Sequence, residues 1–235
     1  MSKLSNLSLA VVEPTYPVNI GHLARLTKNF GLSSMILINP SFKMDEALPF
    51  ASHGADVLRS AKAMSLKEVL ERFDLIIGTT SIGGGSRNIR RDVVPPEEAA
   101  KRLLEIKGSV CILFGRETTG LTNEELELCD MVIRIPTGTQ YQTLNISHAA
   151  AIILYTLLTT RTPRIKRCVV PRELRAVLLN SAVNLAKSSG FPKYKIPLLR
   201  EALKMVINRS NPTHREVTLL LGLFRKAIWA LSRKG

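Results

Sequence analysis

The chain has 235 residues, of which 45% are hydrophobic, and a formal net charge of +14. This composition is ordinary for a globular protein with a sizeable core and excludes a disordered tail. No apolar run reaches the roughly 18 residues of a membrane span, and the amino terminus lacks a signal pattern, so we expect a cytoplasmic protein. Cys111, Cys129 and Cys168 are too scattered for a disulfide framework. The four histidines show no metal-ligand spacing, and we expect no metal site.

The positive charge is confined to the last third of the chain. Residues 1–160 contain 16 Lys and Arg against 16 Asp and Glu, whereas residues 161–235 contain 17 against 3. Such asymmetry is typical of a polyanion-binding module beside a neutral one. An anionic membrane is the rival partner, but it favours aromatic residues beside basic ones. Trp229 is the only tryptophan and lies in an apolar helical pattern, which favours a nucleic acid over a membrane.

Strand-like and helix-like segments alternate through residues 1–160. Apolar runs rich in β-branched residues predict buried strands at residues 7–12, 35–38, 75–77, 110–114 and 131–135. Helices are expected between them at residues 19–30, about 53–60, 95–106, 122–129 and 145–159. Thr122 and Glu125 have the spacing of a capping box at the start of the helix at 122–129. This alternation predicts an α/β fold, with a mainly parallel sheet covered by helices on both faces.

The last part of the chain contains only helical patterns. Apolar stripes predict helices over residues 172–187 and about 198–207, and a capping box of Thr213 and Glu216 begins a final helix. Residues 161–171 hold two prolines and four basic residues without a helical period, which predicts a linker. We therefore expect a first domain of residues 1–160, this linker, and a small basic helical domain of residues 172–235 that binds RNA.

Two loops that follow predicted strands are rich in Gly, Thr, Asn and Gln. Residues 114–125 read FGRETTGLTNEE, and residues 135–147 read IPTGTQYQTLNIS. Loops at the carboxyl ends of strands line the ligand crevice of open α/β sheets. Neither loop has the catalytic Ser, Cys or paired carboxylates of a hydrolase, and no GxGxxG or GxxxxGK[ST] suggests a nucleotide site. The loops predict a cradle for a polar cofactor, with little side-chain chemistry of its own.

These loops, together with the spacing Asn19-x5-Arg25, resemble the three sequence motifs of the SpoU/TrmH branch of the SPOUT methyltransferases. The resemblance spans residues 7 to about 160, and the remainder is similar to the helical extension of transfer-RNA methyltransferases in that branch. It implies methyl transfer from S-adenosylmethionine to a ribose 2′-hydroxyl of transfer RNA, at nucleotide 32 of the anticodon loop. It also implies a trefoil knot, and a homodimer whose active site takes residues from both subunits.

The resemblance also assigns roles to individual residues. Asn19 and Arg25 are implied to lie beside the acceptor ribose, with Arg25 as the principal catalytic residue. Six residues correspond to about 600° of helix, so the two share a face only if Asn19 precedes the helix proper. The residues expected to line the cofactor are Thr79, Thr80, Ser81, Gly115, Glu117, Ile135, Thr143, Leu144 and Asn145. An ordinary ion pair between Arg116 and Glu117 is the alternative for Glu117.

The catalytic role of Arg25 stays open between two versions. A 2′-hydroxyl is a weak acid that must lose its proton as it attacks, whereas arginine, with a pKa above 12, is a poor base. In one version Arg25 accepts the hydroxyl proton after an RNA phosphate has drawn its own proton away. In the other version Arg25 stays charged, clamps the phosphate and orients the ribose.

A basic segment follows the glycine run at residues 83–85. We expect its arginines, Arg87, Arg90 and Arg91, to contact RNA phosphates, which fixes register without reading sequence. A solvated loop is the alternative.

Two other functions remain open. The first is 2′-O-methylation of ribosomal RNA, although those relatives usually carry an amino-terminal RNA-binding extension. The second is RNA binding without catalysis, against which the presence of Asn19, Arg25 and Asn145 argues.

Overall fold

A computed structural model of the chain describes residues 4–82, 93–103, 106–160, 170–210 and 212–233. These residues form two compact units, one within residues 4–160 and the other within residues 170–233. No helix of the described residues is long and apolar enough to cross a membrane.

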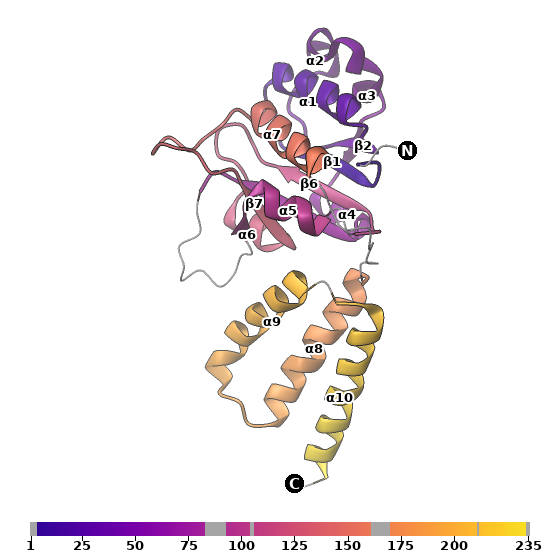
Figure 1. The fold of residues 1–235 in the computed structure, drawn as a ribbon, viewed down its shortest axis with the longest axis vertical. Helices are drawn as coiled ribbons and strands as arrows, with labels where there is room; N and C mark the ends of the chain where they lie inside the picture. Colours follow the sequence, from indigo (N-terminus) through magenta and orange to yellow (C-terminus); the bar gives the residue numbers. More distant parts are fainter. Residues whose placement is uncertain (1–3, 83–92, 104–105, 161–169, 211, 234–235) are drawn as a thin grey trace. The chain divides into compact units, whose positions relative to one another are not determined.

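A fully parallel sheet forms the centre of the first unit (Figure 1). Its seven strands in the described residues are β1 (Leu7–Val12), β2 (Ser34–Ile38), β3 (Lys62–Met64), β4 (Leu75–Thr80), β5 (Val93–Val94), β6 (Val110–Phe114) and β7 (Met131–Arg134). Their order across the sheet is β3-β2-β1-β6-β4-β7-β5. The neighbours β1, β6, β4 and β7 therefore end side by side at one edge, which we call the carboxyl edge of the sheet.

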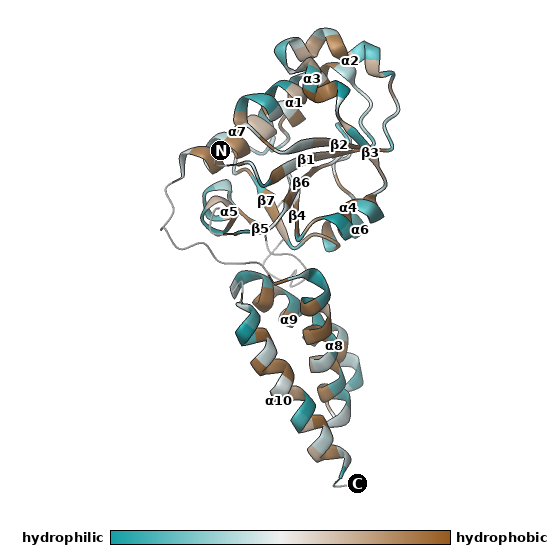
Figure 2. Ribbon diagram, turned by 90° about the vertical axis from the view of Figure 1, so that its right-hand side faces the viewer, coloured by the Kyte–Doolittle hydropathy of each residue, from teal (hydrophilic) through white to brown (hydrophobic). Residues whose placement is uncertain are grey.

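Helices cover both faces of this sheet. They are α1 (Pro17–Phe30), α2 (Met44–Ala51), α3 (Ala55–Arg59), α4 (Leu66–Arg72), α5 (Pro96–Leu103), α6 (Asn123–Glu127) and α7 (Ile146–Thr159). Helices α1 and α7 lie along one face, and α4 and α6 lie along the other (Figure 2). Every residue of β1 and β6 is buried, because parallel strands are covered on both sides. The predicted α/β fold is confirmed, whereas the trefoil knot stays a prediction.

Some elements of the first unit were missed or misplaced by the sequence patterns. Strands β3 and β5 have only three and two residues, too few to show a period. Helix α2 contains Pro49, which normally argues against a helix interior. Helix α4 was missed although Ser65 and Glu68 form a capping box before it. Instead of one helix at about 53–60, a short 3₁₀ turn, η1 (Ser52–Gly54), leads into α3.

The second unit contains three α-helices in its described residues. They are α8 (Arg172–Ser188), α9 (Ile196–Ser210) and α10 (His214–Ser232), with a 3₁₀ turn, η2 (Lys193–Lys195), between α8 and α9. Helix α8 packs against both others, and the buried core residues are Val170, Leu178, Leu179, Ile207, Val217 and Leu221. The predicted capping box of Thr213 and Glu216 begins α10. Of the predicted linker 161–171, residues 161–169 lie outside the description, while Val170 is buried and Pro171 directly precedes α8.

Candidate active site

The carboxyl edge of the sheet brings the three motif segments together. Residues 13–19 follow β1, residues 115–121 follow β6, and residues 135–145 follow β7. Strands β1 and β6 are direct neighbours, and β4 separates β6 from β7. Segments about a hundred residues apart in sequence can therefore exchange hydrogen bonds at this edge.

A chain of side-chain hydrogen bonds joins one residue from each motif. Asn19 is almost fully buried in the first turn of α1, and its Nδ2 donates to Glu117 Oε1 at 3.3 Å. Asn145 Nδ2 donates to Asn19 Oδ1 at 3.0 Å. Asn145 Oδ1 in turn accepts from the backbone nitrogen and hydroxyl of Ser147, at 2.9 and 2.7 Å, and so caps α7. Hydrogen bonds within the protein thus hold the three motif segments in position relative to one another.

The Glu117 carboxylate also caps helix α1 from another loop. It accepts the backbone N–H of Thr15 at 3.2 Å and that of Tyr16 at 3.1 Å. Helix α1 has no acidic residue in its first turn, and its N-cap, Tyr16, makes no side-chain capping bond. A carboxylate at this end satisfies unpaired amide groups and opposes the positive end of the helix dipole. Glu117 is thus bound to the protein itself.

Arg116 holds the second motif loop closed. Its Nη1 and Nη2 each lie 3.0 Å from an oxygen of Glu125, and its Nε donates to Glu13 Oε2 at 2.7 Å. Arg116 and Gly120 also exchange two backbone hydrogen bonds. The guanidinium holds the pKa of Glu13 below its usual range, and the hydrogen bonds that Arg116 donates to Glu125 and Glu13 raise the pKa of Arg116. The alternative ion pair between Arg116 and Glu117 is wrong, because the Arg116 guanidinium forms its ion pairs with Glu13 and Glu125 instead.

Gly115 is required by the closure of this loop. A Cβ at Gly115 would lie 2.1 Å from the carbonyl carbon of Gly120 and 2.2 Å from the nitrogen of Leu121. Both are backbone atoms, so no side-chain rotation could relieve the clash. Gly120 has φ of 70°, the left-handed region that glycine enters without strain.

Side chains around β4 tie the remaining candidate residues to the same edge. Thr79 and Thr80 belong to β4 itself, so the strand extends three residues beyond its predicted end. The Thr79 hydroxyl donates to the Leu113 carbonyl of β6 at 3.0 Å. The Thr80 hydroxyl accepts from the backbone nitrogen of Ile82 at 3.2 Å.

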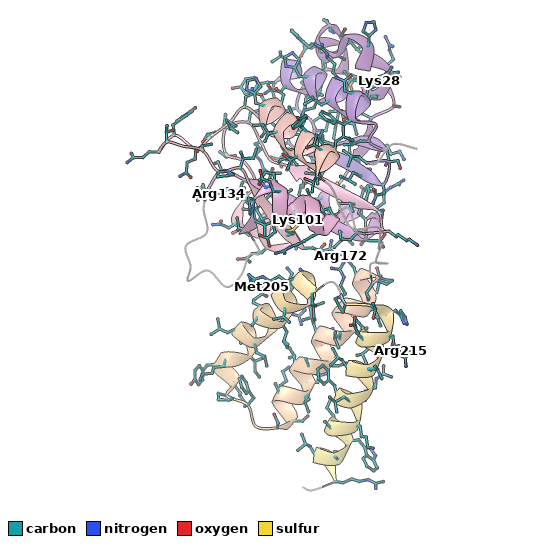
Figure 3. The ribbon with its side chains drawn as sticks, viewed as in Figure 1. Lys28, Lys101, Arg134, Arg172, Met205 and Arg215 are labelled. Carbon is teal, nitrogen blue, oxygen red and sulfur yellow. The ribbon has the colours of Figure 1, made fainter. Side chains whose placement is uncertain are left out.

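Arg134 anchors the loop between β7 and α7 (Figure 3). Its Nε donates to the Ser81 carbonyl at 3.3 Å, and its Nη2 donates to Gln142 Oε1 at 2.9 Å. These bonds hold the base of the loop against the end of β4. The other candidates in this loop are Ile135 and Leu144, both half-buried, and Thr143, which is exposed.

Arg25 does not join this cluster. Asn19 lies inside α1, so the six-residue spacing places the two side chains on different sides of the helix: Asn19 is buried and Arg25 is exposed. Within the described part of the chain, the Arg25 guanidinium makes no hydrogen bond or ion pair. One chain therefore presents Arg25 on a surface apart from the Asn19–Glu117–Asn145 network.

Several residues of the edge were not identified from the sequence. Glu13 and Arg134 lie outside the three sequence motifs, and Gln142 and Ser147 lie inside the third without having been assigned a role. Glu125 ends the second motif, and its predicted capping box with Thr122 is confirmed, but its contact with Arg116 was not predicted. Arg87, Arg90 and Arg91 lie outside the described residues. Among those that are described, no three His, Cys, Asp or Glu side chains gather closely enough to hold a metal ion.

Comparison with known proteins identifies relatives, among them some that cover nearly the whole chain. Residues 6–155 match the SpoU rRNA Methylase family. A protein of Methanocaldococcus jannaschii, tRNA (cytidine-2'-O-)-methyltransferase TrmJ, is 32% identical over 226 residues, which cover 93% of this chain and 98% of the relative. A TrmJ of Sulfolobus acidocaldarius is 34% identical over 161 residues, 68% of each chain.

Solved structures show the same fold. The crystal structure of TrmJ from Z. mobilis ZM4 has a TM-score of 0.68 at 26% sequence identity, covering 93% of this chain and 97% of that one. A probable methylase family protein from Haemophilus influenzae Rd KW20 has a TM-score of 0.69 at 24% identity, covering 99% and 100%. The family match spans more than half of the chain and includes all three motif segments joined at the carboxyl edge. As the motif resemblance predicted, the chain belongs to the SpoU rRNA methylase family.

Proposed function

We propose that this protein is a transfer-RNA ribose 2′-O-methyltransferase that uses S-adenosylmethionine. The observation that carries the proposal is the similarity to the Methanocaldococcus jannaschii tRNA methyltransferase, which extends through both units rather than the first alone. The separation of charge agrees with it, because a neutral unit is followed by residues that carry the whole surplus of +14. The finer assignment, nucleotide 32 of the anticodon loop, follows from the motif resemblance.

The donor would bind at the carboxyl edge, between the second and third motif loops. Half-buried Ile135 and Leu144 offer apolar contact there, and the loops offer backbone donors and acceptors. The hydroxyl of Thr137 is buried and has no hydrogen-bond partner among the described residues. Buried polar groups are normally hydrogen-bonded. A polar group of S-adenosylmethionine bound in this loop would supply the partner that the Thr137 hydroxyl lacks. S-adenosylmethionine supplies an electrophilic methyl group on a sulfonium, so the donor itself needs little activation.

Arg25 would serve the acceptor ribose. Its exposed guanidinium is unengaged within the described residues and is thus available to an RNA phosphate. The 2′-oxygen must lose its proton as the new C–O bond forms, and an ordinary arginine is a weak acceptor. Arg25 either clamps the phosphate and orients the ribose, or accepts the hydroxyl proton after its own proton has been drawn away by that phosphate.

A homodimer would bring Arg25 to the donor. In a single chain Arg25 and the Asn19–Glu117–Asn145 network face different sides of α1. Helix α7, which packs against α1, exposes the apolar side chains Ile152, Tyr155 and Leu158 at three-residue spacing. Such a stripe on a surface helix is typical of an interface. A second copy covering this stripe could place its own Arg25 over the carboxyl edge.

The decisive experiment is incorporation of labelled methyl groups into transfer RNA, followed by mapping of the modified nucleotide. We expect incorporation at ribose 32 and a loss of about 10²- to 10⁴-fold in kcat for Arg25→Ala. Donor affinity, measured by calorimetry, should stay unchanged. Arg59→Ala is the matched control, because it removes another exposed arginine, from α3.

Each part of the proposal can fail separately. Wild-type kcat in Arg25→Ala would remove that residue from catalysis, and no donor binding at millimolar concentration would remove the enzyme assignment. Ribosomal RNA is the second candidate substrate, favoured by the family name that the first unit matches. Methylation of ribosomal RNA alone would replace transfer RNA as the substrate.

A further inference from the structure

Two exposed aromatic side chains of the second unit each carry a cation against their ring. Tyr194, in η2, is 76% exposed, and Lys195 Nζ lies 5.7 Å from its ring centroid. Trp229, near the end of α10, is 53% exposed, and Arg233 Cζ lies 3.9 Å from its ring centroid. Packing into the described core does not account for either ring. Cations over aromatic faces are attracted by the ring quadrupole, and the pairs present a flat apolar face and a positive charge together.

Both pairs lie at the same end of the helical unit. Helices α8 and α10 run in the same direction and α9 runs back, so the α8–α9 connection and the end of α10 share one end of the unit (Figure 1). Exposed Phe191 and Lys193 belong to the same connection. We call these six residues the aromatic–basic cluster: Phe191, Lys193, Tyr194, Lys195, Trp229 and Arg233.

Two of the three acidic residues in the described helical unit lie at the opposite end from the cluster. Glu173 and Glu216 stand in the first turns of α8 and α10, and Glu201 lies in α9. At a helix start a carboxylate favours the dipole, and Glu216 also completes a capping box. Residues 187–195 and 225–233, by contrast, contain six Lys and Arg and no acid. The two segments that form the cluster therefore carry charge of one sign, and the next acidic residue along the chain is Glu201, five residues into α9.

We propose that the aromatic–basic cluster binds unpaired nucleotides of the RNA substrate. Bases that are not paired can stack on exposed aromatic rings, while neighbouring Lys and Arg meet the phosphates. A duplex hides the faces of its bases, so the rings favour a loop or a single strand. This inference rests on the proposed function for the identity of the polyanion, but it does not depend on catalysis.

An anionic membrane is the alternative partner for exposed aromatic and basic residues. The cluster is less suited to it, because its rings come from two separate segments and cations lie over Tyr194 and Trp229. An interfacial helix instead presents one continuous apolar face. The binding experiment therefore also uses anionic lipid vesicles as the alternative ligand.

Trp229 is the only tryptophan of the chain and reports on this site without a label. We expect short oligocytidylate to quench its fluorescence in a saturable way in the full-length protein, without any methyl donor. A duplex RNA with the same number of phosphates, at the same salt concentration, should quench it less. Strong quenching by the duplex, or none by the single strand, would overturn the proposal.

Substitutions at Tyr194 separate stacking from charge. Tyr194→Ala should weaken oligocytidylate binding about tenfold, because each stacked base contributes roughly that factor, while the salt dependence of the affinity stays unchanged. Tyr194→Phe keeps a ring and should bind as the wild type does. Lys193→Gln is the matched control: it should weaken binding and also flatten the salt dependence, by about 0.7 in slope for one lost phosphate contact.

These readouts distinguish the failure of this proposal from failure of the proposed function. If RNA stacked on the cluster but no RNA were methylated, the proposal for the cluster would hold and the proposed methyltransferase activity would fail. Methylation with wild-type affinity in Tyr194→Ala would overturn the cluster alone. A blue shift of Trp229 emission with vesicles of phosphatidylserine and phosphatidylcholine, combined with no response to RNA, would replace the RNA by a membrane. Because Tyr194 is largely exposed, equal melting temperatures will show that the variants are folded.

Discussion

Charged side chains are used differently in the two units. At the carboxyl edge of the sheet, Arg116 binds Glu13 and Glu125, and Glu117 accepts the amide groups that begin α1. At the end of the helical unit, Lys193 and Lys195 are exposed on a short turn without an acidic neighbour in sequence. In the first unit the charged side chains bind other groups of the protein, whereas in the second unit the exposed lysines can bind an external anion.

The difference predicts where substitutions act. A change at the carboxyl edge removes a contact between strands or loops, so it should lower stability as well as donor binding. A change in the aromatic–basic cluster removes no contact with the described core and should lower RNA affinity alone. Buried Arg175 shows that the helical unit also contains a structural cation, since it donates to the Val170 carbonyl and to Asn208. Whether a substitution affects stability or RNA affinity therefore depends on the burial of the side chain and not on its residue type.

Gly115→Ala is expected to have the largest effect. The added Cβ meets backbone at 2.1 and 2.2 Å, so the loop from Gly115 to Gly120 must open. We expect a loss of about 2–4 kcal/mol in the free energy of unfolding and no measurable donor binding. Urea unfolding and calorimetry with S-adenosylmethionine provide the measurements.

Gly138→Ala is the matched control for that substitution. Gly138 lies in the third motif loop, and a Cβ there would meet no heavy atom within 4 Å. Its stability should match that of the wild type. If both variants lost the same stability, the close approach at Gly115 would not be the cause.

Glu117→Gln should have an intermediate effect. The amide side chain keeps one oxygen but loses the negative charge at the start of α1, and it cannot accept all three N–H groups. We expect a loss of about 1–2 kcal/mol in the free energy of unfolding, from the helix dipole and an unpaired donor. Glu71→Gln is the control, because Glu71 is exposed and its nearest lysine nitrogen lies 3.9 Å away. Equal losses in the two variants would contradict the capping role of Glu117.

The fold was predictable where the sequence pattern is local. Five of the strands in the described sheet carry continuous apolar runs, and the capping boxes at Thr122 and Thr213 are confirmed. These signals depend on residues within one element or one turn. The short edge strands and Pro49 inside α2 give no such local signal.

The contacts of the site depend on distant residues and could not be read from the sequence. Asn19 and Glu117 are separated by 98 positions, and Arg116 and Glu13 by 103. The motifs indicated that these segments meet, but not that Glu117 caps α1 or that Arg116 chooses Glu13 and Glu125. Helical geometry did indicate that Asn19 and Arg25 would separate if both lay in one helix. The structure places both in α1.

Removing the ion pair between Glu13 and Arg116 should have the smallest effect on the free energy of unfolding, and this effect should depend on pH. Hydrogen bonding to Arg116 lowers the pKa of Glu13 below its usual 4.5, so the folded state favours the ionised carboxylate. The resulting stabilisation is present above pH 4.5 and is lost as the pH falls through the lowered pKa. Since the Glu13 side chain is about half exposed, water screens the pair. We expect a contribution of a few tenths of a kcal/mol to the free energy of unfolding.

The measurement compares urea unfolding of the wild type and of Glu13→Gln at pH 7 and at pH 3. The difference in unfolding free energy should be larger at pH 7 and should shrink toward pH 3, because protonated Glu13 then resembles the neutral amide. Glu97→Gln, which removes an exposed carboxylate in the first turn of α5, is the control for the loss of a surface carboxylate as such. A difference that grew on acidification would reverse the sign of the linkage. It would mean that the folded state, rather than the unfolded state, binds the proton of Glu13 more tightly.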